Sequence, residues 1–302
     1  MPTEGFTLSF LYKGFKKIAE CGYPALPMIH AEEPFLGDEF KKEALKSNKT
    51  DLQKWNDASP AECELVDIFK AAVVAKSLGV PLYVVHVSTG ESVDLIRYLK
   101  KSGYNIIAET CLHYLMSYDS QDLGVLGKVK PPIRSEANRQ KIWEGVLDGT
   151  LTVIGTDTVP YTRQQKEVEF WSAPYGAGSG IGLLLPIMFS EGFIKRRMTL
   201  DSLAQILSEN PAKAFGMYPQ KGCIAEGFDA DIVVVDPEKE FTVISSNLRC
   251  ASDFSIYEGL KIKGLPVKTY LRGKLVASDG TIVATLPEGQ FIHGLKPFGP
   301  IS

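Results

Sequence analysis

Short apolar runs alternate with longer amphipathic segments up to about residue 220. The runs are rich in aliphatic and β-branched residues and predict strands over residues 24–31, 80–88, 104–111 and 151–158. Apolar residues at helical spacing predict helices over residues 60–79, 91–103, 136–150, 181–192 and 200–217. Strands separated by helices require right-handed crossovers, so the pattern predicts an α/β fold with a parallel sheet.

The pattern changes near residue 221. Segments 222–244 and 267–286 contain short strands joined by Gly and Asp turns, among them the hairpin signal RGK. We therefore expect an α/β domain over residues 1–220, a small β-rich domain over 221–285 and a C-terminal tail over 286–302.

The composition and net charge of the chain indicate to which broad class of protein it belongs. The 302 residues are 44% hydrophobic and 23% charged, as is typical of a soluble globular protein. A net charge of −3 gives no reason to expect nucleic acid or a membrane as a partner. The five cysteines form no CxxC pair, and neither a signal peptide nor a long apolar span is evident, so we expect a cytoplasmic location.

Histidines follow the predicted strands. His30, His86 and His113 lie at or just after the ends of three strands, and Asp157 ends the fourth. The carboxyl ends of parallel strands are where α/β proteins build their sites. Taken alone, His86 in LYVVHVSTGES could be a metal ligand, an acid/base or a hydrogen-bonded core residue. Together with Asp157, the histidines favour a site for a divalent cation.

An ordered series of motifs resembles the cyclic amidohydrolases, the hydantoinase, dihydropyrimidinase and allantoinase group of the amidohydrolase superfamily. The resemblance extends over essentially the whole chain. KVKPPIRSEANR is closer to allantoinases and hydantoinase-like members, whereas YEGLKIKGLPV and the tail are closer to hydantoinases and dihydropyrimidinases. The motifs are HAEEP, YVVHVSTGES, AETCLHYL, KVKPPIRSEANRQKIWEGVLDGTLTVIGTDT, NPAKAFGMYPQKGCIAEGFDADIVVVDP, YEGLKIKGLPVKTYLRGKLV and FIHGLKPF.

The resemblance implies a (β/α)8 TIM-type barrel with a small β-sandwich, of which this chain would supply strands 5 to 8. It implies a divalent metal, usually two zinc ions, with His30 as the strand-5 ligand and His86 as the strand-6 ligand. Asp157 matches the strand-8 aspartate, which binds metal and moves the proton of the attacking water. Lys130 and Ser179 fall near positions whose backbone groups bind the substrate ring; the alternative is that both are ordinary loop residues.

Three features depart from the family pattern. The chain has no His-x-His pair and no counterpart of the bridging lysine, so the resemblance implies an N-terminally truncated member in which residues 1–22 match the helix before strand 5. The helical stretch FLYKGFKKIAECG is better explained as a solvated face that presents its lysines, Lys13, Lys16 and Lys17. Thr158 stands where the family usually has histidine, so a residue that supports the metal ligands is altered.

These observations lead to two hypotheses for function. The first is metal-dependent hydrolysis of the C–N bond of a small cyclic amide, with the missing N-terminal half supplied by a complementing chain or in a longer protein. The second is a non-catalytic homologue that acts as a scaffold or homo-oligomer partner. The chain itself could be a fragment, one half of a two-chain enzyme or a divergent remnant.

Overall fold

The computed structural model describes residues 7–22, 25–285, 287 and 289–294. They form two compact units, one made of residues up to 181 together with 249–256, the other of residues 182–248 and those from 257 on. The division predicted at residues 220 and 285 stays a prediction. Most of the predicted tail, 286–302, lies outside the described residues.

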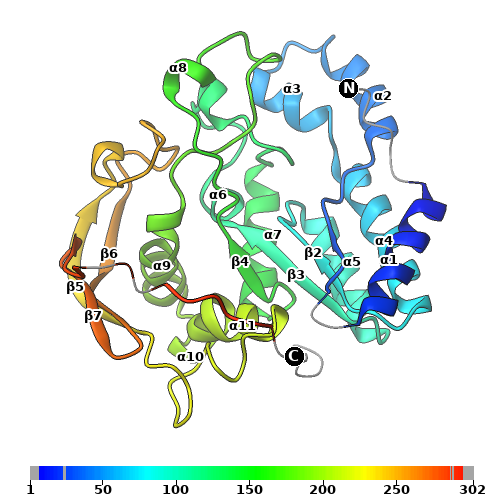
Figure 1. Ribbon diagram of the computed structural model, residues 1–302. Coiled ribbons are helices and arrows are strands. Elements are labelled where there is room, and N and C mark those ends of the chain that lie inside the picture. Colours follow the sequence, from blue (N-terminus) through cyan, green and yellow to red (C-terminus); the bar gives the residue numbers. More distant parts are fainter. Residues whose placement is uncertain (1–6, 23–24, 286, 288, 295–302) are drawn as a thin grey trace. The chain divides into compact units, whose positions relative to one another are not determined.

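A parallel four-stranded sheet forms the centre of the first unit (Figure 1). Its strands lie side by side in sequence order, namely β1 (Met28–Ile29), β2 (Leu82–Val84), β3 (Ile106–Cys111) and β4 (Val153–Gly155). Every residue of β2 is buried, as the continuous apolar run predicts. β2 and β4 end before their apolar runs do, and a positive φ follows each strand two residues later, at His86 and at Asp157.

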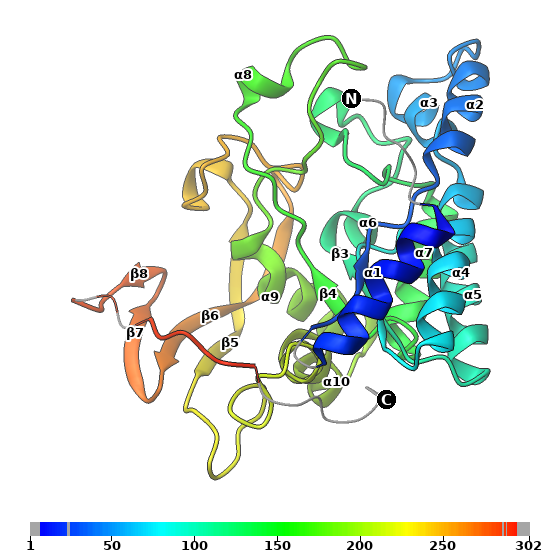
Figure 2. The ribbon, with the colours of Figure 1, turned by 45° about the vertical axis from the view of Figure 1, so that its right-hand side comes forward.

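Helices of the first unit cover one face of this sheet. α4, α5 and α7 lie in a layer on the same side of the strands in both views (Figures 1 and 2). Thr89 and Ser135 cap the N-termini of α5 and α7 with their hydroxyl groups. The helices are α1 (Leu8–Cys21), α2 (Pro34–Ala44), α3 (Asp51–Asp57), α4 (Ala61–Ser77), α5 (Gly90–Lys101), α6 (Leu112–Met116), α7 (Glu136–Leu147) and α8 (Arg163–Lys166), with a 3₁₀ turn, η1, at Gly124–Gly127.

The lysines of α1 lie on a solvated face, as predicted from the sequence. Lys13, Lys16 and Lys17 are exposed, and Lys17 pairs with Glu20 at 3.0 Å. Phe15 is the buried residue of this helix.

The second unit contains an antiparallel sheet in the order β5 (Ile232–Thr242), β6 (Lys261–Leu271), β7 (Lys274–Ser278) and β8 (Thr281–Ile282). The predicted RGK hairpin joins β6 to β7, with positive φ at Arg272 and Gly273. Helical segments precede the sheet, and two of them, η3 and η4, are π-helical where regular helix was predicted. These segments are η2 (Ile181–Leu183), α9 (Leu184–Ile187), η3 (Met188–Lys195), α10 (Leu200–Ala204), η4 (Gln205–Glu209) and α11 (Asn210–Ala214), followed after β5 by η5 (Ser245–Asn247).

None of the helices in the described ranges is both long and apolar enough to cross a membrane.

A buried polar network holds the loop that follows β2. The Glu64 carboxylate on α4 accepts hydrogen bonds from the backbone N–H groups of Ser88 and Thr89, at 3.1 and 3.3 Å, and from both hydroxyl groups. Arg134 donates to the Ser88 hydroxyl at 3.0 Å and to the carbonyl of Ser59. Glu64, Ser88, Thr89 and Arg134 are each at most 3% exposed. This network fixes the main chain immediately after His86.

We expect Glu64→Ala to lower the free energy of unfolding by about 3 kcal/mol, because it leaves buried Arg134 without its neighbouring carboxylate and two N–H groups without an acceptor. Urea unfolding measures this loss. Glu43→Ala removes an exposed carboxylate paired with Lys46 and serves as the control, with no measurable change expected. Equal effects of the two substitutions would contradict the structural role of Glu64.

His113 is a buried histidine at the start of α6. It is fully buried, and neither ring nitrogen has a hydrogen-bond partner. Its ring packs edge-on against Tyr114, with 4.1 Å between the ring centroids. Burial, with a smaller contribution from the charge of His86, lowers the pKa of His113 to about 3. The folded protein therefore keeps this imidazole neutral.

This depressed pKa makes stability depend on pH. Between the ordinary pKa of 6.5 and the folded pKa of about 3, the unfolded chain binds a proton at His113 and the folded chain does not. Stability therefore falls as pH falls through this range, by up to about 1.4 kcal/mol per pH unit for this one group. We expect His113→Phe to show a shallower loss, measured by urea unfolding at about pH 7, 6 and 5. Parallel pH profiles for the two proteins would show that His113 is protonated in the fold.

Candidate metal centre

His30 and His86 meet at the carboxyl edge of the parallel sheet. His30 directly follows β1, and His86 lies two residues after β2. The two strands pair in parallel, Met28 with Tyr83 and Ile29 with Val84. The main chain therefore leaves both strands at the same edge of the sheet. His30 Nδ1 and His86 Nε2 lie 2.8 Å apart. The structure thus brings together two of the predicted metal ligands.

The other contact of each ring indicates where its proton lies. His30 Nε2 is 3.0 Å from the Oε2 atom of Glu32, a carboxylate that can accept a hydrogen bond from a proton on Nε2. His86 has a hydrogen bond with its own main chain that favours the protonated ring. His30 Nδ1 and His86 Nε2 are themselves at hydrogen-bond distance. When each ring donates through its other nitrogen, these two atoms are the ones available as imidazole ligands of a zinc ion.

The main chain is strained at two of the predicted ligands. His86 and Asp157 both have a φ of 42°, in the left-handed region that few residues other than glycine adopt, although Asn, Asp and His do so more often than the rest. Such conformations persist only where the surroundings enforce them. At His86 this is done by Val87 N–H, which donates to the Glu109 carbonyl at 2.7 Å, and by the bonds to Glu64 described above.

The surroundings lower the pKa values of both His86 and Glu32. His86 is 7% exposed, and burial, followed by the charge of His30, lowers its pKa to about 3. Burial of Glu32 opposes ionisation of the carboxylate. The hydrogen bond with His30, the charge of Lys130 and the hydrogen bond from Ser59 outweigh this and lower the pKa of Glu32 to about 2. At neutral pH His86 is therefore a neutral imidazole and Glu32 a carboxylate.

Asp157 lies at the carboxyl end of β4, two residues after Gly155. Its side chain is accessible to solvent, yet the surrounding protein removes enough water to raise its pKa, an effect that the charge of His30 partly offsets. Within the described residues, no three His, Cys, Asp or Glu side chains are grouped closely enough to hold a metal ion. The two histidines are thus brought together, whereas the Asp157 carboxylate does not complete a three-ligand cluster with them.

The two predicted substrate-binding residues have different surroundings. Lys130 Nζ lies 3.4 Å from Glu32 Oε2, so its side chain contacts the carboxylate that faces His30. Ser179 is buried, and its hydroxyl donates to the Phe254 carbonyl at 3.0 Å. The next residue, Gly180, packs closely against Thr158: a Cβ added to Gly180 would lie 2.9 Å from the Thr158 hydroxyl oxygen. Ser179 therefore lies in a loop that touches the segment carrying Asp157.

Glu32 is the residue that the sequence analysis missed. Its side chain is 5% exposed and contacts His30, Lys130 and Ser59. The signal was present in the HAEEP motif, where an acidic residue follows the histidine by two positions. Acidic residues after a strand are common on protein surfaces, so the motif by itself does not distinguish a buried partner from a solvated side chain.

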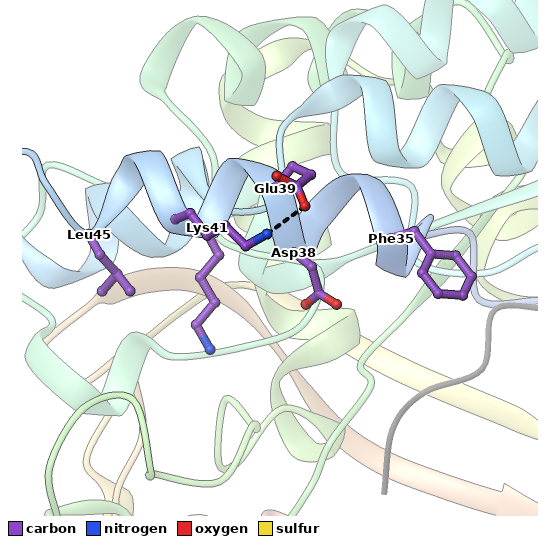
Figure 3. Close-up of a pocket in the computed structure, with 6 residues that line it drawn as sticks. Phe35, Asp38, Glu39, Lys41 and Leu45 are labelled. Carbon is purple, nitrogen blue, oxygen red and sulfur yellow. Dashed lines mark hydrogen bonds and ion pairs between the residues drawn. The ribbon is translucent and has the colours of Figure 1, made fainter.

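Two surface hollows lie elsewhere. One, of about 610 Å³, follows the exposed side of α2, where Lys42 donates to Glu39 at 2.6 Å (Figure 3). The second, of about 590 Å³, lies between α3 and the segment around η1. Neither hollow includes the histidines, Asp157 or the other predicted site residues.

Comparison with known proteins identifies the family of this chain. Residues 36–276 match the Amidohydrolase family. The chain is 34% identical over 291 residues to an allantoinase of Rubrobacter xylanophilus, covering 96% of this chain and 63% of the relative. It is 31% identical over 287 residues to an L-hydantoinase of Paenarthrobacter aurescens, covering 93% of this chain and 62% of the relative.

The fold agrees with solved structures. A D-hydantoinase from a Bacillus species superimposes with a TM-score of 0.89 at 32% identity, covering 98% of this chain and 66% of that chain. The fold class predicted from the sequence, part of a TIM-type barrel with a β-rich module, is confirmed. The chain spans less than two thirds of the length of the two curated relatives. Because the family match extends over most of its length, the chain belongs to the amidohydrolase family.

Proposed function

We propose that this chain provides part of the active site of a metal-dependent hydrolase that opens the C–N bond of a small cyclic amide. The observation that carries the proposal is the close approach of His30 Nδ1 and His86 Nε2, 2.8 Å apart at the carboxyl edge of the parallel sheet. The relatives named allantoinase and hydantoinase support the substrate class. Imidazole and carboxylate donors together favour zinc as the metal.

Each residue has a distinct task in this proposal. His30, His86 and Asp157 would hold the cation once further ligands complete the site. A divalent cation bound there would acidify water and polarise the amide carbonyl. Asp157 takes the proton from the attacking water and passes it to the leaving nitrogen, so that water adds across the C–N bond. The raised pKa of Asp157 suits a group that must both accept and release a proton.

Lys130 and Ser179 are proposed to bind the substrate ring through their backbone groups. Ser179 uses its hydroxyl within the fold, and the Lys130 ammonium group faces Glu32. Their side chains are therefore engaged, which leaves main-chain atoms as the groups that could recognise the planar amide.

The parallel sheet supports a proposal about partners. In the described part of the chain, β1 and β4 are the edge strands, and Met28 in β1 is 47% exposed. Open edges of a parallel sheet leave main-chain donors and acceptors without strand partners. We propose that further barrel strands, in a longer protein, a complementing chain or a second copy, close these edges and complete the metal site.

The absence of a three-ligand cluster among the described residues favours a second candidate function. In it, the chain keeps the family fold but acts as a non-catalytic scaffold or oligomer partner. Native mass spectrometry separates the two ideas, because a strictly monomeric chain that finds no partner contradicts the scaffold.

A complementation experiment tests the hydrolase. The chain is mixed with the part of the Rubrobacter xylanophilus allantoinase that has no counterpart here, and zinc content and the hydrolysis of allantoin, hydantoin and dihydrouracil are measured. We expect hydrolysis only in the mixture. Asp157→Asn should lower the rate by roughly 10²- to 10⁴-fold because the proton carrier is lost, and His86→Asn should lower zinc retention.

The matched control for this experiment is Asp94→Asn. It removes an exposed carboxylate that pairs with Arg97 on α5, so zinc content and rate should be unchanged. Absence of both zinc and hydrolysis in the complemented wild type would contradict the hydrolase and leave the scaffold as the better explanation.

A further inference from the structure

Both carboxylate oxygens and the backbone N–H group of Glu32 have polar contacts. Its Oε2 atom lies 3.0 Å from His30 Nε2 and 3.4 Å from Lys130 Nζ, and its Oε1 atom accepts the Ser59 hydroxyl. Its backbone N–H donates to the Asp67 carboxylate at 3.1 Å. A carboxylate with this many contacts has little freedom to move away from His30.

The contact with His30 has a specific chemical consequence. A neutral imidazole carries one proton on one of its two nitrogens, and a carboxylate beside Nε2 accepts that proton in a hydrogen bond. The Nδ1 atom, which faces His86, is then left with its lone pair. Without an acceptor at Nε2, the proton would be free to occupy Nδ1 and would block the point at which the two rings converge.

We propose that Glu32 is a positioning residue that fixes the proton of His30 on Nε2 and thereby keeps Nδ1 available to a cation shared with His86. The value of this role to catalysis rests on the proposed hydrolase function. The position of the proton is a property of the metal-free chain and can be measured independently of activity.

Lys130 and Ser59 supply the restraint on Glu32. They lie on opposite oxygens, the ammonium group at Oε2 and the hydroxyl at Oε1. A contact on each oxygen prevents the carboxylate from rotating its Oε2 atom away from the imidazole. The Lys130 side chain therefore helps to orient the carboxylate that faces His30. This is in addition to the backbone role proposed above.

Three variants separate the tautomer role from a general structural role. Glu32→Met removes the acceptor but keeps the length of the side chain, whereas Glu32→Gln retains one acceptor oxygen. Glu33→Met is the matched control, since Glu33 is the neighbouring carboxylate but pairs with Lys70. All are prepared as the full chain, stripped of metal by a chelator, with ¹⁵N-labelled histidine.

Long-range ¹H–¹⁵N correlation spectra at about pH 8, where an ordinary imidazole is neutral, report which nitrogen carries the proton. The chain has four histidines, so His30 can be assigned from the signal lost in His30→Asn. We expect the Nε2–H form in the wild type, in Glu32→Gln and in Glu33→Met, and a shift to the Nδ1–H form or a mixture in Glu32→Met. A wild-type His30 in the Nδ1–H form, or a folded Glu32→Met that keeps Nε2–H, overturns the proposal.

Zinc affinity, measured by competition with a chromophoric chelator, gives the second readout. We expect Glu32→Met to bind zinc roughly 10- to 100-fold more weakly than the wild type, with a smaller loss for Glu32→Gln and none for Glu33→Met. Equal zinc affinity of Glu32→Met and wild type overturns the role toward the metal. If the wild type binds no zinc even in the complemented mixture, the proposed function fails, whereas the tautomer result still decides the role of Glu32.

Discussion

The approach of His30 to His86 depends on the register of two neighbouring parallel strands. In this register the rings cross edge to face, with 4.6 Å between their centroids. Successive residues of a strand point to opposite faces of the sheet, so a slip of one position would turn one ring away from the other. The alignment of β1 with β2 therefore determines whether the site exists. The apolar residues that bury β2 on both faces hold that alignment.

One helix anchors the loops that carry both histidines. Glu64 and Asp67 are three residues apart on α4 and so lie on the same side of the helix. Glu64 accepts the N–H groups that follow His86, and Asp67 accepts the N–H of Glu32, which follows His30. Movement of α4 would displace both loops together. The distance between the two imidazoles is thus protected against small shifts of this helix.

Much of this arrangement could be predicted from the sequence, because it follows from periodicity. The apolar runs predicted the four parallel strands, and the position of each histidine after a run placed His30 and His86 at one edge. Glu32 could not be predicted in this way. Its burial depends on Ser59 and Lys130, which are far away in the sequence, and no local pattern encodes such contacts. The π-helical turns after residue 187 were missed for a similar reason, since apolar spacing does not distinguish them from a regular helix.

The environment of His113 could not be predicted from the sequence pattern either. Its position after β3 suggested a third member of the histidine set, yet the structure buries it completely against Tyr114 without a hydrogen-bond partner. Neighbouring strand ends therefore do not guarantee that side chains share a site. The direction in which each side chain leaves its turn decides the matter, and this direction depends on packing.

The left-handed backbone at His86 and Asp157 has a consequence for how this protein can change. Each such conformation costs on the order of 1–3 kcal/mol, and glycine would adopt it without that penalty. Replacement of either residue by glycine would therefore relax the main chain at the same time as it removes a functional group. Selection for stability alone would favour glycine at these two positions, whereas the proposed metal site requires the imidazole and the carboxylate. A lineage that retains His86 and Asp157 in this backbone does so against the local energetic preference of its own fold.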